Sequence, residues 1–385
     1  MAEESGLTRQ IAIYGNPSVP PVHLGAPDWL AAAEQCLDAK AAGYLLGNAG
    51  AEDTAAANRD AFARWRIRPR VLRDVSRRDW SCRIGDCPLT WPVLLAPVGA
   101  QGILHPAGER ATAEAAAAAD TPFILSTVSS ATLEDVAALL PARLRWFQLY
   151  CGRDWEVMAS LVARAERQDY QALVVTVDTP MLGWRPRDLQ NAYLPFLEGQ
   201  GLANYWSDPA FRAKLGGDPA EQPERAVELF LATFVNPAFT WHDLTRLIQL
   251  TRLPVLVKGL THPDDARDAV RAGARGIVVS THGGRQLDGA VPALQALPAV
   301  VAAVGDRVPV LFDSGIRHGA DVVKALALGA RAVLWGRPYA AALAVAGAAG
   351  VQQSLLDLRA EMDLTLAMAG VTRLDEVGPA MLAPA

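Results

Sequence analysis

Short runs of β-branched and aliphatic residues recur along the chain, and each run ends at a polar residue or a glycine. Such nearly continuous apolar runs are typical of strands that are buried on both faces of a parallel sheet. The runs predict eight strands, at Pro92–Ala96, Phe123–Leu125, Arg145–Leu149, Ala172–Val177, Pro254–Val257, Gly276–Val279, Pro309–Phe312 and Ala332–Trp335.

Helical stretches separate these strands, and several end at a glycine. They are predicted at Glu109–Ala119, Leu133–Leu140, Trp155–Arg167, Pro263–Ala272, Leu294–Val304 and Ala320–Leu328. Six of the seven intervals between strand starts span 22 to 33 residues, about one βα unit each. Eight strands in this order predict an α/β fold, a (β/α)8 TIM barrel. A doubly wound open sheet is the alternative, but no Gly-x-Gly-x-x-Gly turn follows Pro92–Ala96.

The barrel does not account for the whole chain, which we predict to be a single domain of 385 residues. Helical patterns over Pro27–Lys40 and Asp53–Trp65 precede the first strand, and further helices follow the last one. The predicted parts are an N-terminal helical segment (1–77), the barrel with its insertion (78–349) and a C-terminal helical cap (350–385).

The interval between the starts of the fourth and fifth strands is the exception, at 82 residues. After one helix and its turns are subtracted, roughly fifty residues remain, far more than an ordinary βα connection needs. This insertion, residues 190–243, leaves the C-terminal end of the fourth strand, where barrel enzymes build their active sites. A lid over the site is one interpretation, and a peripheral decoration or oligomer contact is the equal alternative.

The formal net charge is −5, with 51% hydrophobic and 20% charged residues. An acidic balance argues against a general nucleic-acid or anionic-membrane binder. No signal peptide is visible, and polar residues interrupt the apolar stretches before membrane-spanning length, so we expect a soluble, cytoplasmic protein. Four scattered cysteines predict reduced thiols and no metal site; Cys82 and Cys87 flank an expected turn.

Polar residues stand where most of the predicted strands end, and in a barrel these ends face one mouth. No packing requirement places lysine, histidine and several arginines at such positions, so the set as a whole indicates a site. The strand-end residues are Pro97, Val98 and Gly99, Ser126, Gln148 and Tyr150, Thr176 and Asp178, Lys258, Ser280 and His282, Asp313, Gly315 and Arg317, and Gly336 and Arg337.

The segment after the sixth strand, Ser280–Gly289, narrows the chemistry most. His282 can take a proton near neutral pH, and Arg285, three residues later, can hold a carboxylate. A lone strand-end histidine is often structural, but this pairing favours acid–base chemistry on a carboxylate-bearing substrate.

The ends of the last two strands carry Gly315 with Arg317 and Gly336 with Arg337. Either loop alone is compatible with turn glycines and solvated arginines. Loops after strands 7 and 8 commonly build a phosphate site on this fold, so together they favour a phosphate-bearing cofactor.

These segments resemble a known family, the FMN-dependent L-2-hydroxy-acid oxidases and dehydrogenases. Ser280–Gln286 is similar to the family's Ser-Asn-His-Gly-Gly-Arg-Gln motif, and the resemblance extends from about Ile13 to Val377. Supporting stretches are Arg68–Leu72, Phe147–Tyr150, Val177–Pro180 and Pro254–Gly259. Within the family, the chain resembles the lactate 2-monooxygenase branch most, and the segments that carry this resemblance are Gly183–Leu189, Leu194–Leu197 and Asn204–Pro209.

The resemblance implies FMN as cofactor, a lactate-like 2-hydroxy acid and oxygen as partners, and a homotetramer. It makes His282 the base for the α-hydroxyl proton during hydride transfer to the flavin, with Asp178 orienting the imidazole. The implied substrate-binding residues are Tyr44, Tyr150, Arg185 and Arg285. The implied cofactor-binding residues are Pro97, Val98 and Gly99 along one flavin edge; Ser126, Gln148 and Thr176 at the polar end of the ring, and Ser280; Lys258 near N1 and O2; and Asp313, Gly315, Arg317, Gly336 and Arg337 at the ribityl and phosphate groups.

Three positions depart from the family pattern. Thr281 replaces the usual Asn, Ser314 a frequent Gly, and Gly99 a frequent Ala. We expect Thr281 to alter hydrogen bonding near His282, Ser314 to have little effect on phosphate binding, and Gly99 to leave more room over the flavin.

Three hypotheses follow. The first is a monooxygenase that decarboxylates the bound keto acid. The second is an oxidase that releases keto acid and hydrogen peroxide, or a dehydrogenase with another electron acceptor. The third is a catalytically silent flavin- or phosphate-binding barrel with a partner-binding insertion, against which the intact His282, Arg285, Arg185 and Lys258 set weighs.

Overall fold

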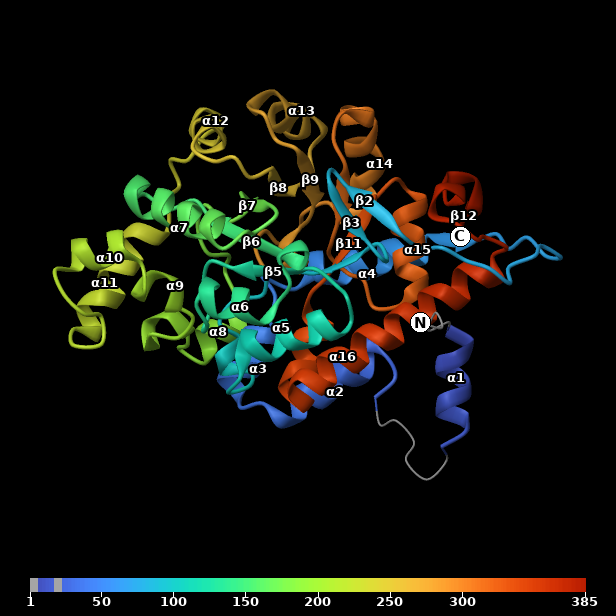
Figure 1. Ribbon diagram of the computed structural model, residues 1–385, viewed down its shortest axis with the longest axis horizontal. Helices are drawn as coiled ribbons and strands as arrows, with labels where there is room; N and C mark the ends of the chain where they lie inside the picture. The colour runs from blue at the N-terminus through green and yellow to red at the C-terminus, as the bar shows by residue number, and fades with distance from the viewer. Residues whose placement is uncertain (1–5, 17–22) are drawn as a thin grey trace.

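The computed structural model describes residues 6–16 and 23–385, and its centre is a closed barrel of parallel strands (Figure 1). The first five residues of the predicted N-terminal segment, and residues 17–22, lie outside the described part. The barrel strands are β4 (Val93–Leu95), β5 (Phe123–Ser126), β6 (Arg145–Tyr150), β7 (Leu173–Thr176), β8 (Val255–Leu260), β9 (Gly276–Val279), β10 (Val310–Phe312) and β11 (Ala332–Trp335). Pairing of β11 with β4 closes the ring, so the predicted (β/α)8 barrel is confirmed.

The barrel strands are apolar on both faces because each face meets a different core. Along β4, Leu94 points into the barrel interior, whereas Val93 and Leu95 pack into the layer between the barrel and its helices. All three side chains are fully buried. This alternation explains why the strands show continuous apolar runs instead of a polar–apolar repeat.

A two-stranded hairpin closes the N-terminal end of the barrel. It is formed by β2 (Cys82–Ile84) and β3 (Cys87–Leu89), with the predicted turn at Gly85 and Asp86 between them. Its four buried side chains join the interior cluster, and both cysteines are free thiols. Because this end is plugged by apolar side chains, the open end of the barrel is the one at the carboxyl ends of the strands.

Helices cover the outside of the barrel and match the sequence-based expectation closely. They are α5 (Gly108–Ala118), α6 (Leu133–Leu139), α7 (Trp155–Arg167), α13 (Pro263–Ala272), α14 (Ala293–Val304) and α15 (Gly319–Ala327). Short 3-10 turns lie between these elements or near the C-terminus, at η1 (Gln101–Ile103), η2 (Ala142–Leu144), η4 (His282–Gly284), η5 (Gly305–Arg307), η6 (Leu374–Glu376) and η7 (Pro379–Met381).

The N-terminal segment is helical as predicted, but one helix boundary was wrong. The expected helix Pro27–Lys40 is two helices, α2 (Ala26–Cys36) and α3 (Ala39–Leu46). The break has a physical cause: Asp38 adopts an extended backbone, and its carboxylate accepts a hydrogen bond from Ala41 N, which caps a new helix. The remaining elements are α1 (Gly6–Tyr14), α4 (Asp53–Ala63) and β1 (Trp65–Ile67), which pairs with β12 (Leu382–Pro384).

The insertion after β7 is helical and lies on one side of the barrel (Figure 1). It contains η3 (Pro195–Glu198), α9 (Ala203–Trp206), α10 (Pro209–Leu215) and α11 (Pro223–Phe234). The short helix α8 (Pro186–Gln190) precedes it, and α12 (Trp241–Gln249) follows it and packs beside α13 as a helix of the barrel. The fully buried Asn204 fastens it to the barrel, because its amide donates to Ser126 O and Thr127 O and accepts from Leu133 N. Arg164 of α7 adds ion pairs to Glu134 and to the buried Asp208.

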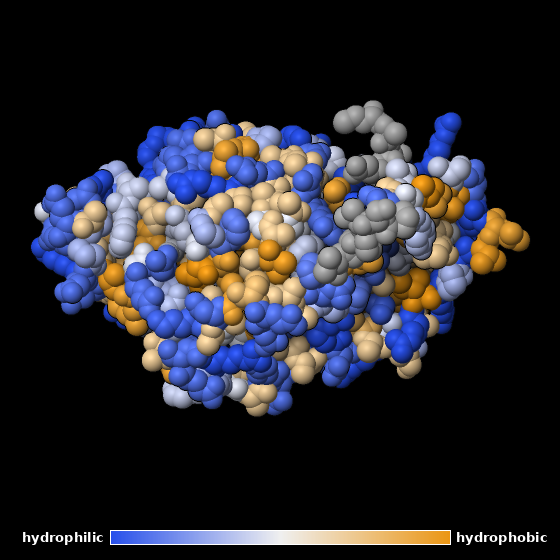
Figure 2. Space-filling view, turned by 90° about the horizontal axis from the view of Figure 1, so that it is seen from below, coloured by the Kyte–Doolittle hydropathy of each residue, from blue (hydrophilic) through white to orange (hydrophobic). Residues whose placement is uncertain are grey.

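The last helix, α16 (Arg337–Met368), starts directly after β11 and spans the predicted start of the C-terminal cap at residue 350. Its backbone leaves helical geometry at Ala346 and Gly347. By length and composition α16 could cross a membrane, but more than half of its most apolar stretch of 18 residues is buried inside the protein. Contacts with α2 and α5 account for that apolar surface, and polar residues surround the apolar ones on this face (Figure 2).

Candidate active site

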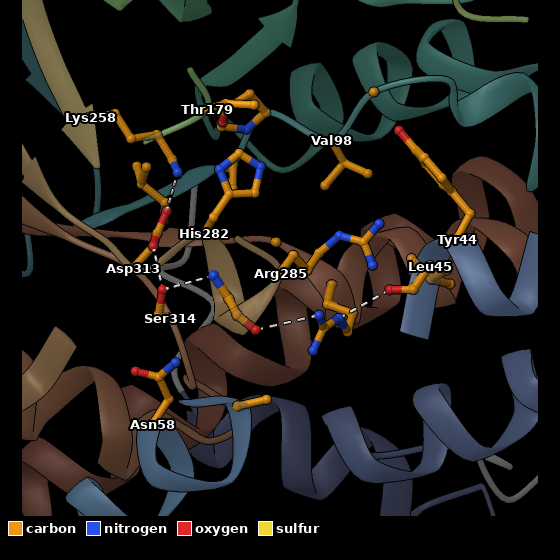
Figure 3. Close-up of a pocket in the computed structure, with 18 of the residues that line it drawn as sticks. Tyr44, Leu45, Asn58, Val98, Thr179, Lys258, His282, Arg285, Asp313 and Ser314 are labelled. Atoms are coloured by element: carbon orange, nitrogen blue, oxygen red, sulfur yellow. Dashed lines mark hydrogen bonds and ion pairs between the residues drawn. The ribbon is translucent and has the colours of Figure 1, made fainter. Parts of the chain in front are cut away.

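A cavity opens at the carboxyl ends of the barrel strands, where the predicted site residues converge (Figure 3). The cavity is open to solvent at its mouth and has both polar and apolar walls, as a ligand site commonly does. The predicted residues that line it are Tyr44, Pro97, Val98, Gly99, Tyr150, Arg185, Lys258, His282, Arg285, Asp313, Gly315, Arg317, Gly336 and Arg337. The other predicted residues do not line it but contact residues that do, or one another: Asp178 bonds His282, Ser280 bonds Lys258, Ser126 bonds Gln148, and Thr176 is paired with Lys258 in the barrel sheet.

His282 and Asp178 form a hydrogen-bonded pair at the centre of the site. His282 Nδ1 lies 2.9 Å from Asp178 Oδ1, so the other ring nitrogen, Nε2, is left for a ligand. Burial lowers the pKa of His282 below its ordinary value, although Asp178 opposes this effect. Burial alone would raise the pKa of Asp178, but His282 and Lys258 outweigh it and hold that pKa below the ordinary value. A neutral imidazole beside an ionised carboxylate is the state that a general base requires.

The backbone at His282 is in an uncommon conformation that neighbouring hydroxyls hold in place. Its φ is +54°, a left-handed value that few non-glycine residues adopt. Ser280 Oγ accepts a hydrogen bond from His282 N at 3.0 Å. Ser314 Oγ accepts from Thr281 N and Gly283 N, each at 3.1 Å. Three consecutive N–H groups are therefore anchored, which fixes the direction of the imidazole.

Arg185 and Arg285 approach the cavity from two loops. Arg185 Nε donates to Arg285 O at 3.0 Å, and an Arg285 N–H group donates to Gly47 O. Burial and the neighbouring Arg185 lower the pKa of Arg285 to about 10, which still leaves it charged at neutral pH. The two buried guanidinium groups form a natural binding site for a carboxylate.

The two predicted tyrosines lie at the same end of the cavity. Tyr44 belongs to α3, and the Arg285 guanidinium lies 5.3 Å from the centre of its ring. Tyr150 ends β6 and packs edge-on against Phe234 at 5.3 Å between ring centres. Burial raises the pKa of both phenols, so each stays a neutral hydrogen-bond donor at neutral pH.

Lys258, at the end of β8, is a buried cation with a carboxylate partner. Its Nζ lies 3.1 Å from Asp313 Oδ2 and donates to Ser280 Oγ at 3.0 Å. Burial alone would lower the pKa of Lys258, but Asp313 and Asp178 outweigh it and hold that pKa above its ordinary value. Lys258 therefore carries a permanent positive charge beside His282 (Figure 3).

Two buried polar groups at the ends of β6 and β7 have no hydrogen-bond partner within the described residues. Gln148 Oε1 accepts a hydrogen bond from Ser126 Oγ at 3.1 Å, whereas Gln148 Nε2 and Thr176 Oγ1 are buried without one. Buried polar atoms are rarely left unpaired in a native protein. These atoms are free to bond the polar edge of a ligand.

A further part of the cavity wall is rich in positive charge. Burial, together with Arg59, lowers the pKa of Arg317 to about 10, and burial lowers the pKa of Arg337 well below its ordinary value. Arg337 bonds the neutral oxygens Leu45 O and Asn48 Oδ1, at 3.1 and 2.8 Å. Arg337 also opens α16, whose first N–H groups add partial positive charge. Such a wall is suited to a phosphate group.

Glycine is required at Gly315 for two reasons. Its φ is +91°, and a Cβ atom there would lie 2.6 Å from Asn58 O of helix α4. Gly336 has no such constraint, since a Cβ there would meet only Ala96 Cβ, at 3.4 Å.

The expectation for Gly99 needs correction. A methyl group at this position would lie 2.7 Å from Val128 Cγ2 and 2.8 Å from Val128 O. The space next to Gly99 is therefore filled by Val128, and the missing methyl does not simply leave room over the ring.

A family model described as FMN-dependent dehydrogenase matches residues 33–384. The chain belongs to this family. L-lactate oxidase of Lysinibacillus sphaericus (strain C3-41) is 43% identical over 333 residues, 86% of each chain. An FMN-dependent alpha-hydroxy acid dehydrogenase of Penicillium citrinum is 41% identical over 370 residues, 95% of this chain and 90% of the relative. A crystal structure of mandelate oxidase has a TM-score of 0.83 at 40% identity, covering 94% of this chain and 98% of that one.

FMN is accordingly the cofactor of this chain, and the cavity fits it. The unpaired Gln148 Nε2 and Thr176 Oγ1 would meet the polar part of the flavin ring. Arg317 and the first turn of α16 would hold the phosphate. The sequence-based family assignment and cofactor are thus confirmed.

Several residues that complete the site were not assigned roles from the sequence. Ser314, expected to matter little, anchors both sides of His282, and its hydroxyl donates to Asp313 Oδ1 at 2.8 Å. Asn58 of α4 donates to Thr281 Oγ1 at 2.8 Å, which places the Thr281 departure in a buried contact. Phe196 and Phe234 bring the insertion into the cavity wall, as the lid interpretation expects. Only the polar character of Ser314 and Asn58 hinted at these contacts, because their partners lie far away in sequence.

Gln286 is another such residue, and all four hydrogen-bonding positions of its amide are used. Nε2 donates to Asp178 O and Met181 O, both at 2.9 Å. Oε1 accepts from Arg185 Nη2 at 2.6 Å and from Gly183 N at 3.2 Å. One side chain therefore joins the loop of the base to the loop that carries Asp178 and Arg185.

We expect Gln286→Met to lower kcat/KM for an L-2-hydroxy acid on the order of 100-fold, because small misplacements of reacting groups are costly. Anaerobic stopped-flow reduction at several substrate concentrations should show both weaker binding and slower reduction. Gln295→Met, on the exposed face of α14, is the matched control and should match wild type. Wild-type kinetics in Gln286→Met would contradict the positioning role.

Proposed function

We propose that this protein oxidises a lactate-like L-2-hydroxy acid with oxygen as the electron acceptor. The observation that carries the proposal is the His282–Asp178 pair, whose free Nε2 borders a cavity that also holds Arg185 and Arg285. Removal of hydrogen from a 2-hydroxy acid needs a general base and a cationic site that binds the carboxylate, and this cavity has both.

In the proposed mechanism, Arg185 and Arg285 bind the substrate carboxylate, and Tyr44 and Tyr150 hydrogen-bond the substrate. His282 Nε2 takes the α-hydroxyl proton, and Asp178 stabilises the imidazolium that forms. FMN, when bound, supplies the two-electron acceptor for the hydride that leaves the α-carbon. Lys258 would stabilise the negative charge that bound FMN gains when it accepts the hydride. Overall, hydroxy acid and oxygen give keto acid and hydrogen peroxide.

We further propose that the keto acid stays bound and reacts with the peroxide, giving a shortened carboxylate, carbon dioxide and water. Two features support retention: Phe196 and Phe234 of the anchored insertion wall the cavity, and two arginines hold the carboxylate. The likeness of Gly183–Leu189 to lactate 2-monooxygenases points the same way. Release of keto acid and peroxide is the second candidate, favoured by relatives named as oxidases.

Product analysis after aerobic turnover of L-lactate tests this proposal. We expect acetate and carbon dioxide, formed even when excess catalase is present. Catalase is the essential control, because free peroxide decarboxylates free pyruvate in solution without any enzyme. Pyruvate as the main product in the presence of catalase would assign the protein to the oxidases.

We also propose that the protein assembles as a cytoplasmic homotetramer. Apolar side chains beside the cavity mouth support an interface there: Met181, Trp184 and Leu287 are 62%, 74% and 69% exposed in the single chain. Exposed apolar clusters of this kind commonly mark protein contacts.

A further inference from the structure

The two arginines predicted to bind the substrate carboxylate share one carboxylate of the protein itself. Asp188 Oδ2 lies 4.0 Å from Arg185 Nη1 and 3.9 Å from Arg285 Nη2. Within the described residues, no other carboxylate lies within 4.0 Å of either guanidinium. Asp188 is the third residue of α8 and lies behind the arginines, outside the cavity wall.

Asp188 does not lock the arginines in place. Its contacts with them are at the outer limit of an ion pair and beyond hydrogen-bond distance, and its buried Oδ1 has no hydrogen-bond partner in the described chain. The arginines are held instead by hydrogen bonds to Gly47 O, Arg285 O and Gln286 Oε1. Asp188 therefore contributes mainly negative charge, at a place with little water to screen it.

A substrate carboxylate brings a second negative charge to the same pair of guanidinium groups. Asp188 has already balanced one of the two positive charges, and it repels the incoming anion. The same repulsion acts on the keto acid product, which carries the same carboxylate.

We propose that Asp188 is a built-in competitor that weakens the binding of carboxylate ligands and limits how long the keto acid stays in the site. This inference rests on the proposed function, because it takes a 2-hydroxy acid and its keto acid as the ligands. It assigns Asp188 a charge-tuning role in specificity and not a place among the reacting groups.

The test compares an anionic and a neutral ligand in the FMN-loaded enzyme. Pyruvate and lactamide are titrated against wild type and Asp188→Asn, and binding is followed by the change in flavin absorbance. We expect the Kd of pyruvate to fall about tenfold in the variant, because the nearest negative charge is gone while the shape of the side chain is kept. The Kd of lactamide should stay within about twofold, and the gain for pyruvate should come from slower dissociation.

Glu34→Gln is the matched control variant. Glu34 belongs to α2 and pairs at 3.3 Å with Arg187, the neighbour of Asp188 on α8, but this ion pair lies on the surface. Glu34→Gln therefore changes the net charge by the same amount as Asp188→Asn without acting on the cavity. Pyruvate affinity should be unchanged there. Asp188→Ala, as a second variant, should change pyruvate affinity in the same direction as Asp188→Asn.

An unchanged or weaker affinity for pyruvate in both Asp188 variants would overturn the proposal. Parallel weakening of pyruvate and lactamide would show that Asp188 only supports the structure. Failure of the proposed function looks different, since wild-type flavin would then stay oxidised when L-lactate is added without oxygen.

Discussion

Replacing His282 with glutamine is expected to slow anaerobic reduction of FMN by L-lactate about 100- to 10,000-fold, the usual contribution of a positioned general base. Glutamine can still hydrogen-bond Asp178 but cannot accept the α-hydroxyl proton. FMN should remain bound, because the change alters one side chain of the cavity and leaves Arg317, Arg337 and the first turn of α16 in place. Stopped-flow absorbance gives the rate constant, and the protein-to-flavin absorbance ratio gives the occupancy.

The pH dependence of the same step gives a second measure of the base. His282 must be neutral to accept a proton, so the reduction rate should fall as the pH drops through its pKa. Since burial lowers that pKa, the acid limb should lie below pH 6.5, the ordinary value for histidine. The limb should disappear in His282→Gln, which has no imidazole to titrate.

A matched control is available at His262, an exposed residue at the start of α13. Its replacement with glutamine should leave both the rate of reduction and its pH profile as in wild type. Reduction at near wild-type rate in His282→Gln, with FMN bound, would remove His282 from the role of base.

The barrel could be predicted from the sequence because its strands meet apolar surroundings on both faces. Leu94 and Val93 are both apolar although one faces the interior and the other the helices, so the whole strand is visible as an apolar run. Boundaries set by local chemistry were less visible. The break between α2 and α3 depends on the hydrogen bond of a single residue, Asp38, and apolar periodicity continues across it.

The reacting groups of the site were also predictable, since the ends of parallel strands in a closed barrel must share one rim. The groups that position them were not. Gln286 meets Asp178 and Arg185 across about one hundred residues of sequence. Asp188 is near Arg185 by its spacing of three residues, but its contact with Arg285 joins segments almost one hundred residues apart. Such contacts depend on the tertiary arrangement, which neither residue type nor spacing specifies.

Replacing Lys258 with methionine is expected to destabilise the protein by about 3–5 kcal/mol, because it leaves the Asp313 carboxylate buried without its cation. Both side chains are nearly inaccessible, with exposed fractions of 5% and 10%, so solvent screens this pair little. Ser314 Oγ remains as a hydrogen-bond donor to Asp313 but carries no compensating charge. Urea unfolding of the FMN-saturated protein measures the loss.

The double variant Lys258→Met with Asp313→Asn separates the structural role of Lys258 from its proposed role near the flavin. It removes both charges together, so most of the lost stability should return, as a double-mutant cycle on a coupled pair requires. Flavin reduction should stay slow, because the cation proposed to stabilise the negative charge that the hydride brings is gone. If the double variant regains both stability and the wild-type rate of reduction, Lys258 serves only to balance Asp313, and stabilisation of the reduced flavin must come from other groups at the rim.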